Sequence, residues 1–249
     1  MKRRKWLIAL IAASGLISLL LWHNTPIIVG EWTKQTLYLW GINCFHFPSE
    51  NRKPKILLID DDGEYGIFVI KQLCKEIQMK ATFAIVPERM DQVRTDSIRA
   101  WLNDGFGLAL HGYNHDDWRN LTYQQVLKDI EKCEKWLQQN HFDDNAIKYV
   151  VSPHGSNTHA VRDAIKHKGY QMVTGGNILN PDTEVFQLGR VMITKETDLE
   201  GMRVWLTKAK ERNLFVIFGT HSSIPDEFSI EKTRAVLNMA KDMGFEFNN

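Results

Sequence analysis

Three adjacent carboxylates, Asp60 to Asp62, end a short apolar stretch and are followed by Gly63. Residues 56–59 before them are all Ile or Leu, and such a run bounded by turn residues is typical of a fully buried strand. Adjacent carboxylates repel one another, so a compact fold keeps them together only with a counter-charge, usually a metal ion or an arginine. On these residues alone, a solvated acidic turn is the alternative interpretation.

Histidines end two further apolar stretches. His111 follows residues 106–110, with His115 four positions later, and His221 closely follows residues 215–218. In a barrel of parallel strands, the carboxyl ends of all strands lie on one face, so these side chains can converge with the carboxylates. One carboxylate and two imidazoles leave open positions on a divalent metal, which is the arrangement needed to activate water. The combination, rather than the histidine pair alone, indicates a metal site.

The elements that must position these residues alternate along the chain from residue 55 onward. Strands are predicted at residues 56–59, 81–86, 106–110, 147–151, 170–174, 185–193, 215–218 and 245–247. Helices are predicted at residues 65–78, near 98–102, from Thr122 to Leu137, through 161–165, at 199–209 and from Ser229 to Gly244. This α/β alternation implies parallel strands with right-handed crossovers. About seven units fit, which favours a barrel over an open sheet.

These motifs resemble those of the polysaccharide deacetylases of carbohydrate esterase family 4, the NodB-homology domain. The first motif of that family, Thr-Phe-Asp-Asp-Gly, is similar to Ile-Asp-Asp-Asp-Gly here and implies that Asp61 is the general base and Asp62 a metal ligand. The second, His-Ser/Thr-x-x-His, is similar to His-Gly-Tyr-Asn-His and implies that His111 and His115 are the other ligands. The late Leu-x-His motif is similar to Gly-Thr-His and implies that His221 is the general acid.

The resemblance extends from about residue 55 to the C-terminus. It implies a distorted (β/α)7-type barrel that hydrolyses N-acetyl groups on an amino-sugar polysaccharide and releases acetate. The implied cofactor is a divalent metal, with zinc foremost, although cobalt, nickel and manganese also suit an Asp/His/His ligand set. A non-catalytic glycan-binding barrel and a metal-dependent amidase acting on a small amide are the alternatives.

Two departures from the family pattern concern the base. The third motif, Arg-Pro-Pro-Tyr-Gly, corresponds to Val-Ser-Pro-His-Gly at residues 151–155, so the arginine that orients the base is missing. This shorter form resembles the branch that deacetylates poly-N-acetylglucosamine, and that resemblance implies that Arg190 braces the acidic cluster; a surface arginine is the other interpretation. Asp60 stands where the family has Phe. Its carboxylate would either raise the pKa of the base or point into solvent.

The N-terminal residues predict a membrane anchor. A basic run from Lys2 to Lys5 precedes an uncharged stretch from Trp6 to Trp22, which as a helix would span about 25 Å, near the lower limit for a bilayer. The basic flank predicts a cytoplasmic N-terminus and an extracytoplasmic catalytic domain, in the periplasm or at the cell surface. A cleaved signal peptide is the competing interpretation, but no small-x-small cleavage site follows Leu21.

The chain of 249 residues is therefore divided into an anchor at 1–23, a connector at 24–54 and a catalytic domain at 55–249. The formal net charge of +1 gives no reason to expect a nucleic-acid partner. Cys74 and Cys133 fall on apolar helix faces and are predicted to be core residues rather than metal ligands. The identity of the polymer and the oligomeric state are left open.

Overall fold

The computed structural model describes residues 53–143, 146–176, 179–181 and 183–247. The predicted anchor at 1–23 and nearly all of the connector at 24–54 lie outside these ranges, so both stay predictions. Among the described residues, no helix has the length and apolarity needed to cross a bilayer.

The described ranges contain one parallel sheet that curves into a barrel. Eight strands lie side by side in the order β6-β5-β4-β3-β2-β1-β8-β7, and β9 pairs with β1. The strands are β1 (Lys55–Asp60), β2 (Thr82–Ile85), β3 (Gly107–Leu110), β4 (Ile147–Val151), β5 (Gln171–Thr174), β6 (Gln187–Gly189), β7 (Val191–Met192), β8 (Phe215–Thr220) and β9 (Glu246–Phe247).

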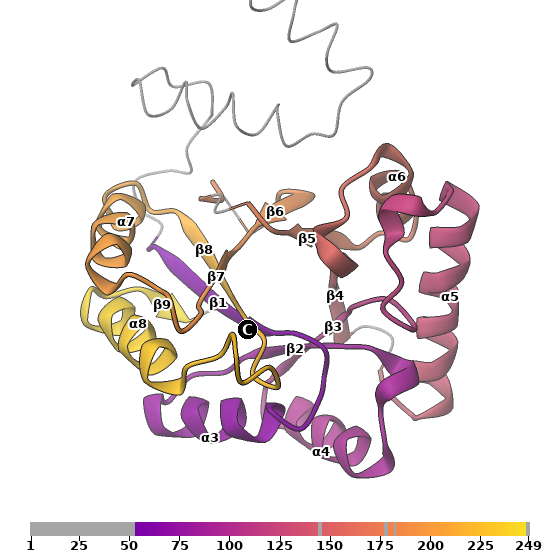
Figure 1. The fold of residues 1–249 in the computed structure, drawn as a ribbon, viewed down its shortest axis with the longest axis horizontal. Coiled ribbons are helices and arrows are strands. Elements are labelled where there is room, and N and C mark those ends of the chain that lie inside the picture. Colours follow the sequence, from indigo (N-terminus) through magenta and orange to yellow (C-terminus); the bar gives the residue numbers. More distant parts are fainter. Residues whose placement is uncertain (1–52, 144–145, 177–178, 182, 248–249) are drawn as a thin grey trace, which may run out of the picture.

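Helices surround the strands on the outside of the barrel (Figure 1). They are α3 (Ile67–Ile77), α4 (Gln92–Asn103), α5 (Tyr123–Gln139), α6 (His159–His167), α7 (Leu199–Glu211) and α8 (Ile230–Asp242). The start of α5 is the predicted capping box: the Thr122 side chain accepts from the backbone N–H of Gln125, whose side chain accepts from the backbone N–H of Thr122.

The chain itself closes the barrel between β6 and β7. The predicted single strand at 185–193 is interrupted at Arg190, because β6 pairs with β5 whereas β7 pairs with β8. The backbone N–H of Arg190 still donates to the carbonyl of Thr174, at 3.0 Å. β6 and β7 together occupy one strand position in the barrel. With β9 set aside, the described strands therefore fill seven positions, in agreement with the predicted seven units.

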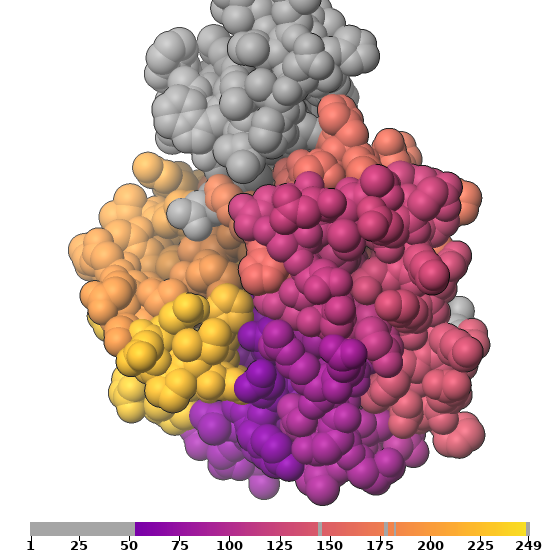
Figure 2. All heavy atoms as spheres, turned by 45° about the vertical axis from the view of Figure 1, so that its right-hand side comes forward, coloured from indigo at the N-terminus to yellow at the C-terminus, as the bar shows by residue number. Residues whose placement is uncertain are grey.

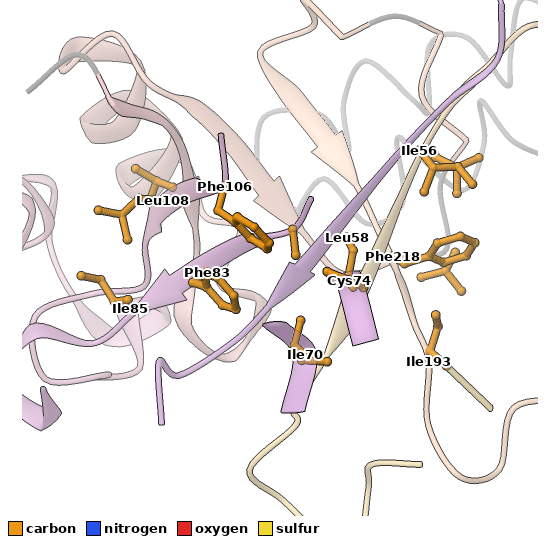
Figure 3. Close-up of a cluster of buried hydrophobic side chains, with 14 of the residues drawn as sticks. Ile56, Leu58, Ile70, Cys74, Phe83, Ile85, Phe106, Leu108, Ile193 and Phe218 are labelled. Atoms are coloured by element: carbon orange, nitrogen blue, oxygen red, sulfur yellow. The ribbon is translucent and has the colours of Figure 1, made fainter. Parts of the chain in front are cut away.

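The core lies on both sides of the strands, because side chains alternate between the two faces of a strand. Ile56 and Leu58 of β1 belong to one cluster with helix residues such as Ile70 and Cys74, and Leu58 lies beside Cys74 in Figure 3. Leu57 alternates with them and belongs to a second cluster, made almost entirely of strand residues. This burial on both faces explains why the strand sequences are continuously apolar.

The first and last helices of the described barrel lie together. Figure 2 shows the yellow C-terminal residues beside the indigo residues that follow β1. Lys241 of α8 donates to the carbonyl of Ile77 at 2.7 Å, and Arg234 of α8 pairs with Glu76 of α3 at 3.0 Å. These contacts join the first and last helices of the described chain on the outer surface of the barrel.

Candidate active site

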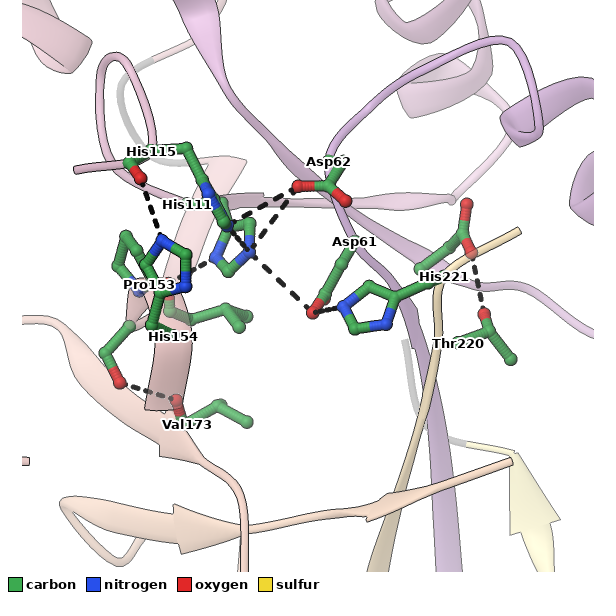
Figure 4. A network of polar contacts seen from close by, with 12 residues as sticks. Asp61, Asp62, His111, His115, Pro153, His154, Val173, Thr220 and His221 are labelled. Carbon is green, nitrogen blue, oxygen red and sulfur yellow. Dashed lines mark hydrogen bonds and ion pairs between the residues drawn. The ribbon is translucent and has the colours of Figure 1, made fainter. Parts of the chain in front are cut away.

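The register of the sheet brings the predicted residues to one end of the barrel. Asp60 of β1 lies opposite Thr220 of β8, so that Asp61 and His221, the next residue of each chain segment, emerge side by side. All six residues predicted from the sequence converge there, several of them shown in Figure 4: Asp61, Asp62, His111, His115, Arg190 and His221.

Asp62, His111 and His115 form a group that fits a divalent metal. Each offers a ligand atom, and these atoms all lie within 4.8 Å of one another. The Nε2 atoms of the two histidines are 3.2 Å apart, and Oδ1 of Asp62 lies 3.6 Å from Nε2 of His115. That Oδ1 is buried and has no hydrogen-bond partner among the described residues. A buried carboxylate oxygen that accepts no hydrogen bond and lies beside two ring nitrogens is what a bound cation would satisfy.

The protonation state of both histidines suits metal binding. Nδ1 of His111 lies 2.7 Å from the carbonyl oxygen of Val151, which can only accept, so Nδ1 carries the proton and Nε2 has a free lone pair. Burial is the main reason that the pKa of His111 is lowered. Burial and the neighbouring His111 lower the pKa of His115 to about 4. Both rings are therefore neutral at neutral pH, as metal ligands must be.

The backbone is left-handed at two of the three candidate ligands and at the motif glycine. Asp62 has φ 73° and His115 has φ 65°, a conformation that non-glycine residues seldom adopt. Gly63 has φ 65°, and a Cβ placed on it would lie 2.9 Å from Cγ2 of Ile85. The glycine of the first motif is thus required both by the turn and by the close approach of β2.

Arg190 binds the predicted base directly. Its two terminal nitrogens donate to the two carboxylate oxygens of Asp61, each at 2.6 Å, and both side chains are buried. Burial alone would raise the pKa of Asp61, but the charge of Arg190 opposes it and the pKa lies well below its usual range. Gly219 of β8 leaves room for this arginine, because a Cβ there would lie 3.2 Å from Cδ of Arg190.

His221 lies between two carboxylates. Its Nε2 is 3.3 Å from Oδ2 of Asp61, and its Nδ1 is 2.8 Å from Oε2 of Glu227. The hydrogen bond to Asp61 is the largest of the effects that raise the pKa of His221 to about 9. Sequence reasoning missed Glu227, an acid in a loop six residues beyond His221 that belongs to no recognisable motif.

Asp60 is neither exposed nor free. Its carboxylate accepts from the hydroxyl of Thr220 at 2.7 Å, and from both the backbone N–H and the hydroxyl of Ser222, at 3.0 and 2.6 Å. Burial raises the pKa of Asp60 to about 7 against the lowering effect of these bonds. The expectation that it points into solvent is wrong, and so is the expectation of a raised base pKa, since that of Asp61 is lowered. Asp60 ties β1 to the segment that carries His221.

Asp129 of α5 is a second residue that sequence reasoning missed. Its Oδ2 accepts from the backbone N–H of Tyr113 at 2.8 Å and from Nε1 of Trp118 at 3.2 Å. Tyr113 lies between His111 and His115, so Asp129 holds the loop that joins these two residues. The helical pattern places Asp129 next to the buried Ile130, but no spacing rule links it to the histidines.

The sequence model of the polysaccharide deacetylase family matches residues 49–173, half of the chain. No curated protein matches the chain.

Several solved structures share the fold. The chitin deacetylase of Colletotrichum lindemuthianum is 17% identical, with a TM-score of 0.60, over 80% of this chain and 86% of that one. A family 4 acetyl xylan esterase from Clostridium thermocellum, solved with a cobalt ion, is 17% identical, with a TM-score of 0.56, over 78% and 87%. A family 4 pseudoenzyme from Bacillus anthracis is 13% identical, with a TM-score of 0.56, over 82% and 66%.

Proposed function

The chain belongs to the polysaccharide deacetylase family, and we propose that it hydrolyses carbon–nitrogen bonds as a divalent-metal-dependent N-deacetylase of an extracytoplasmic amino-sugar polysaccharide. The observation that carries this proposal is the arrangement around Asp61. One carboxylate is held by Arg190 and faces His221, directly beside the Asp62, His111 and His115 group.

We assign the metal to Asp62, His111 and His115. A divalent metal held there, zinc in the first instance, would act as a Lewis acid on the acetamide carbonyl and would lower the pKa of water. The chain supports this by keeping His111 in one tautomer through Val151 and by holding the intervening loop through Asp129.

Asp61 and His221 have the charge states required of a base and an acid. Arg190 keeps Asp61 ionised, so it is ready to take a proton from the attacking water. With its pKa near 9, His221 is protonated at neutral pH and can give a proton to the departing amine. Glu227 orients the ring by accepting from Nδ1, which leaves Nε2 facing Asp61.

The alternative of a non-catalytic, glycan-binding barrel rests on the arginine and the aromatic residue that are missing from the third motif. Arg190 supplies a guanidinium to Asp61 from the break between β6 and β7, which favours the enzyme. The same feature, with the short Pro153-His154-Gly155 turn, supports a likeness to the poly-N-acetylglucosamine branch. N-acetylglucosamine oligomers are therefore the first substrates to test, with a small N-acetyl amide alongside to test the amidase alternative.

We further propose that residues 1–23 anchor the protein in a membrane, with the catalytic domain on the extracytoplasmic side. The support is the charge pattern of Lys2 to Lys5 before the uncharged stretch that ends at Trp22. Protease added outside bacterial spheroplasts should degrade the catalytic domain, and protection of that domain would refute this orientation.

The decisive experiment measures acetate release from N-acetylglucosamine oligomers by the full-length, zinc-loaded protein. Asp61→Asn should lower kcat by about 10²-fold or more while zinc binding persists, because the base is lost and the ligands are kept. Asp62→Ala should lose both zinc binding and activity. Asp163→Asn, exposed on α6, is the matched control and should retain both. Full turnover by Asp61→Asn would refute the assigned mechanism.

A further inference from the structure

A groove adjoins the metal group, that is Asp62, His111 and His115, on the side of Arg89. It has a volume of about 370 Å³ and is lined by residues of the segments that follow β1, β2 and β8 and by the first turn of α4: Glu64, Tyr65, Gly66, Arg89, Arg94 and Ser223. Arg89 connects the groove to the metal group, because its Nη1 lies 3.6 Å from Oδ1 of Asp62. The groove therefore lies next to the candidate metal ligands, with Arg89 between them.

Tyr65 is the most distinctive residue of the groove. It is 59% exposed, and no large hydrophobic residue in the described part of the chain is more exposed. It is nevertheless held in place: its hydroxyl donates to Oδ2 of Asp91 at 2.8 Å, and its ring lies 4.8 Å from the guanidinium carbon of Arg94. A pre-positioned, exposed aromatic face loses little entropy when a ligand covers it.

Arg94 is fixed and leaves the groove little unmatched charge. It is buried, with its guanidinium donating to Oδ2 of Asp91 and to the carbonyls of Gly63 and Arg89. The half-exposed Arg89 faces two carboxylates, those of Asp62 and Glu64, each at 3.6 Å. Even with Asp62 engaged by a metal, Glu64 and Asp91 offset the charges of Arg89 and Arg94, so the groove favours an uncharged, hydroxyl-bearing ligand over an ionic one.

We propose that this groove is a subsite for a neutral sugar ring adjacent to the one that is deacetylated, and that Tyr65 stacks against its apolar C–H face. Burial of that face supplies the free energy, and Glu64, Arg89 and Ser223 offer acceptors and donors to the ring hydroxyls. The proposal rests on the proposed function and names Tyr65 as a determinant of chain-length preference.

The test compares Tyr65→Ala with the unmodified full-length protein on N-acetylglucosamine and on its pentamer. The increase in KM that Tyr65→Ala causes should be about tenfold larger for the pentamer than for the monomer, because the monomer does not reach the groove. Tyr65→Phe keeps the ring and should stay within about threefold of the unmodified protein. Val93→Ala removes another exposed side chain, on α4 and outside the groove lining, and should change neither substrate.

Binding of the pentamer to the zinc-loaded protein, followed by calorimetry, separates this proposal from the proposed function. If no acetate is released, a tenfold weaker affinity in Tyr65→Ala still supports the subsite. If acetate is released and Tyr65→Ala has the same KM values as the unmodified protein for both the monomer and the pentamer, the subsite is overturned and the deacetylase proposal stands. Absence of both pentamer binding and acetate release would overturn the subsite as well.

Discussion

At the scale of single residues, the site is a row of alternating charges. Arg190 holds Asp61, Asp61 faces His221, and His221 meets Glu227. Each charge favours the ionised form of its neighbours, and Asp61 and Arg190 are buried. The row therefore sets two opposite pKa shifts at once: that of Asp61 falls and that of His221 rises.

The raised pKa of His221 predicts a pH-dependent stability. A group whose pKa is higher in the folded state stabilises the fold fully below its unfolded pKa, about 6.5 for histidine. That stabilisation is lost as the pH rises through the folded value of about 9. Denaturant unfolding of the metal-free protein should show the free energy of unfolding falling between these pH values, by at most about 3 kcal/mol.

His221→Gln should flatten this decline, because the titrating ring is gone. His167→Gln, exposed on α6, is the matched control and should keep the profile of the unmodified protein. A decline of the same size in His221→Gln would assign the effect to another group.

At the scale of elements, most of the barrel could be predicted because its signals are local. The apolar run at 56–59 becomes β1 with one more residue at each end, and the helix after Thr122 begins with the predicted capping box. The candidate site followed for the same reason: polar residues that end apolar strands must meet at the carboxyl edge of a parallel sheet.

The features that sequence reasoning missed depend on distant neighbours. The break at Arg190 arises because β6 and β7 pair with different strands, and nothing within residues 185–193 announces two partners. Glu227 and Asp129 act through loops whose path is set by tertiary packing. The expectations that Asp60 points into solvent or raises the pKa of the base were both wrong, because its partners, Thr220 and Ser222, lie 160 and 162 residues away.

The break between β6 and β7 at Arg190 gives a prediction at the scale of elements. Gly219→Ala adds a Cβ that would lie 3.2 Å from Cδ of Arg190 and in closer conflict with Met192. The neighbouring side chains must then give way, Arg190 by a few tenths of an ångström, and because this loosens its hold on Asp61 we expect kcat for acetate release to fall about tenfold, with zinc affinity unchanged. Gly175→Ala is the matched control, since nothing lies within 4 Å of its added Cβ. Equal kcat in the two variants would show that Gly219 does not position Arg190.

At the scale of the whole molecule, the site depends on closure of the ring. Arg190 reaches Asp61 across 129 residues of sequence, and the β1–β8 pairing sets Asp61 beside His221. The candidate ligands come from the ends of β1 and β3, two strands separated by β2. The metal group is therefore assembled only when several units of the barrel have packed together, so a metal that binds there binds the folded state alone.

Such selective binding predicts that zinc stabilises the entire barrel. At a free zinc concentration of about 100 Kd, the free energy of unfolding should rise by about 2.7 kcal/mol, and a chelator should reverse the gain. Denaturant unfolding followed by both circular dichroism and tryptophan fluorescence should show one shared shift, because the ligands span the ring. His111→Ala should abolish the gain, whereas Asp163→Asn, exposed on α6, should preserve it. A zinc-dependent gain that survives in His111→Ala would place the bound ion elsewhere in the chain and would separate metal binding from the residues around Asp61.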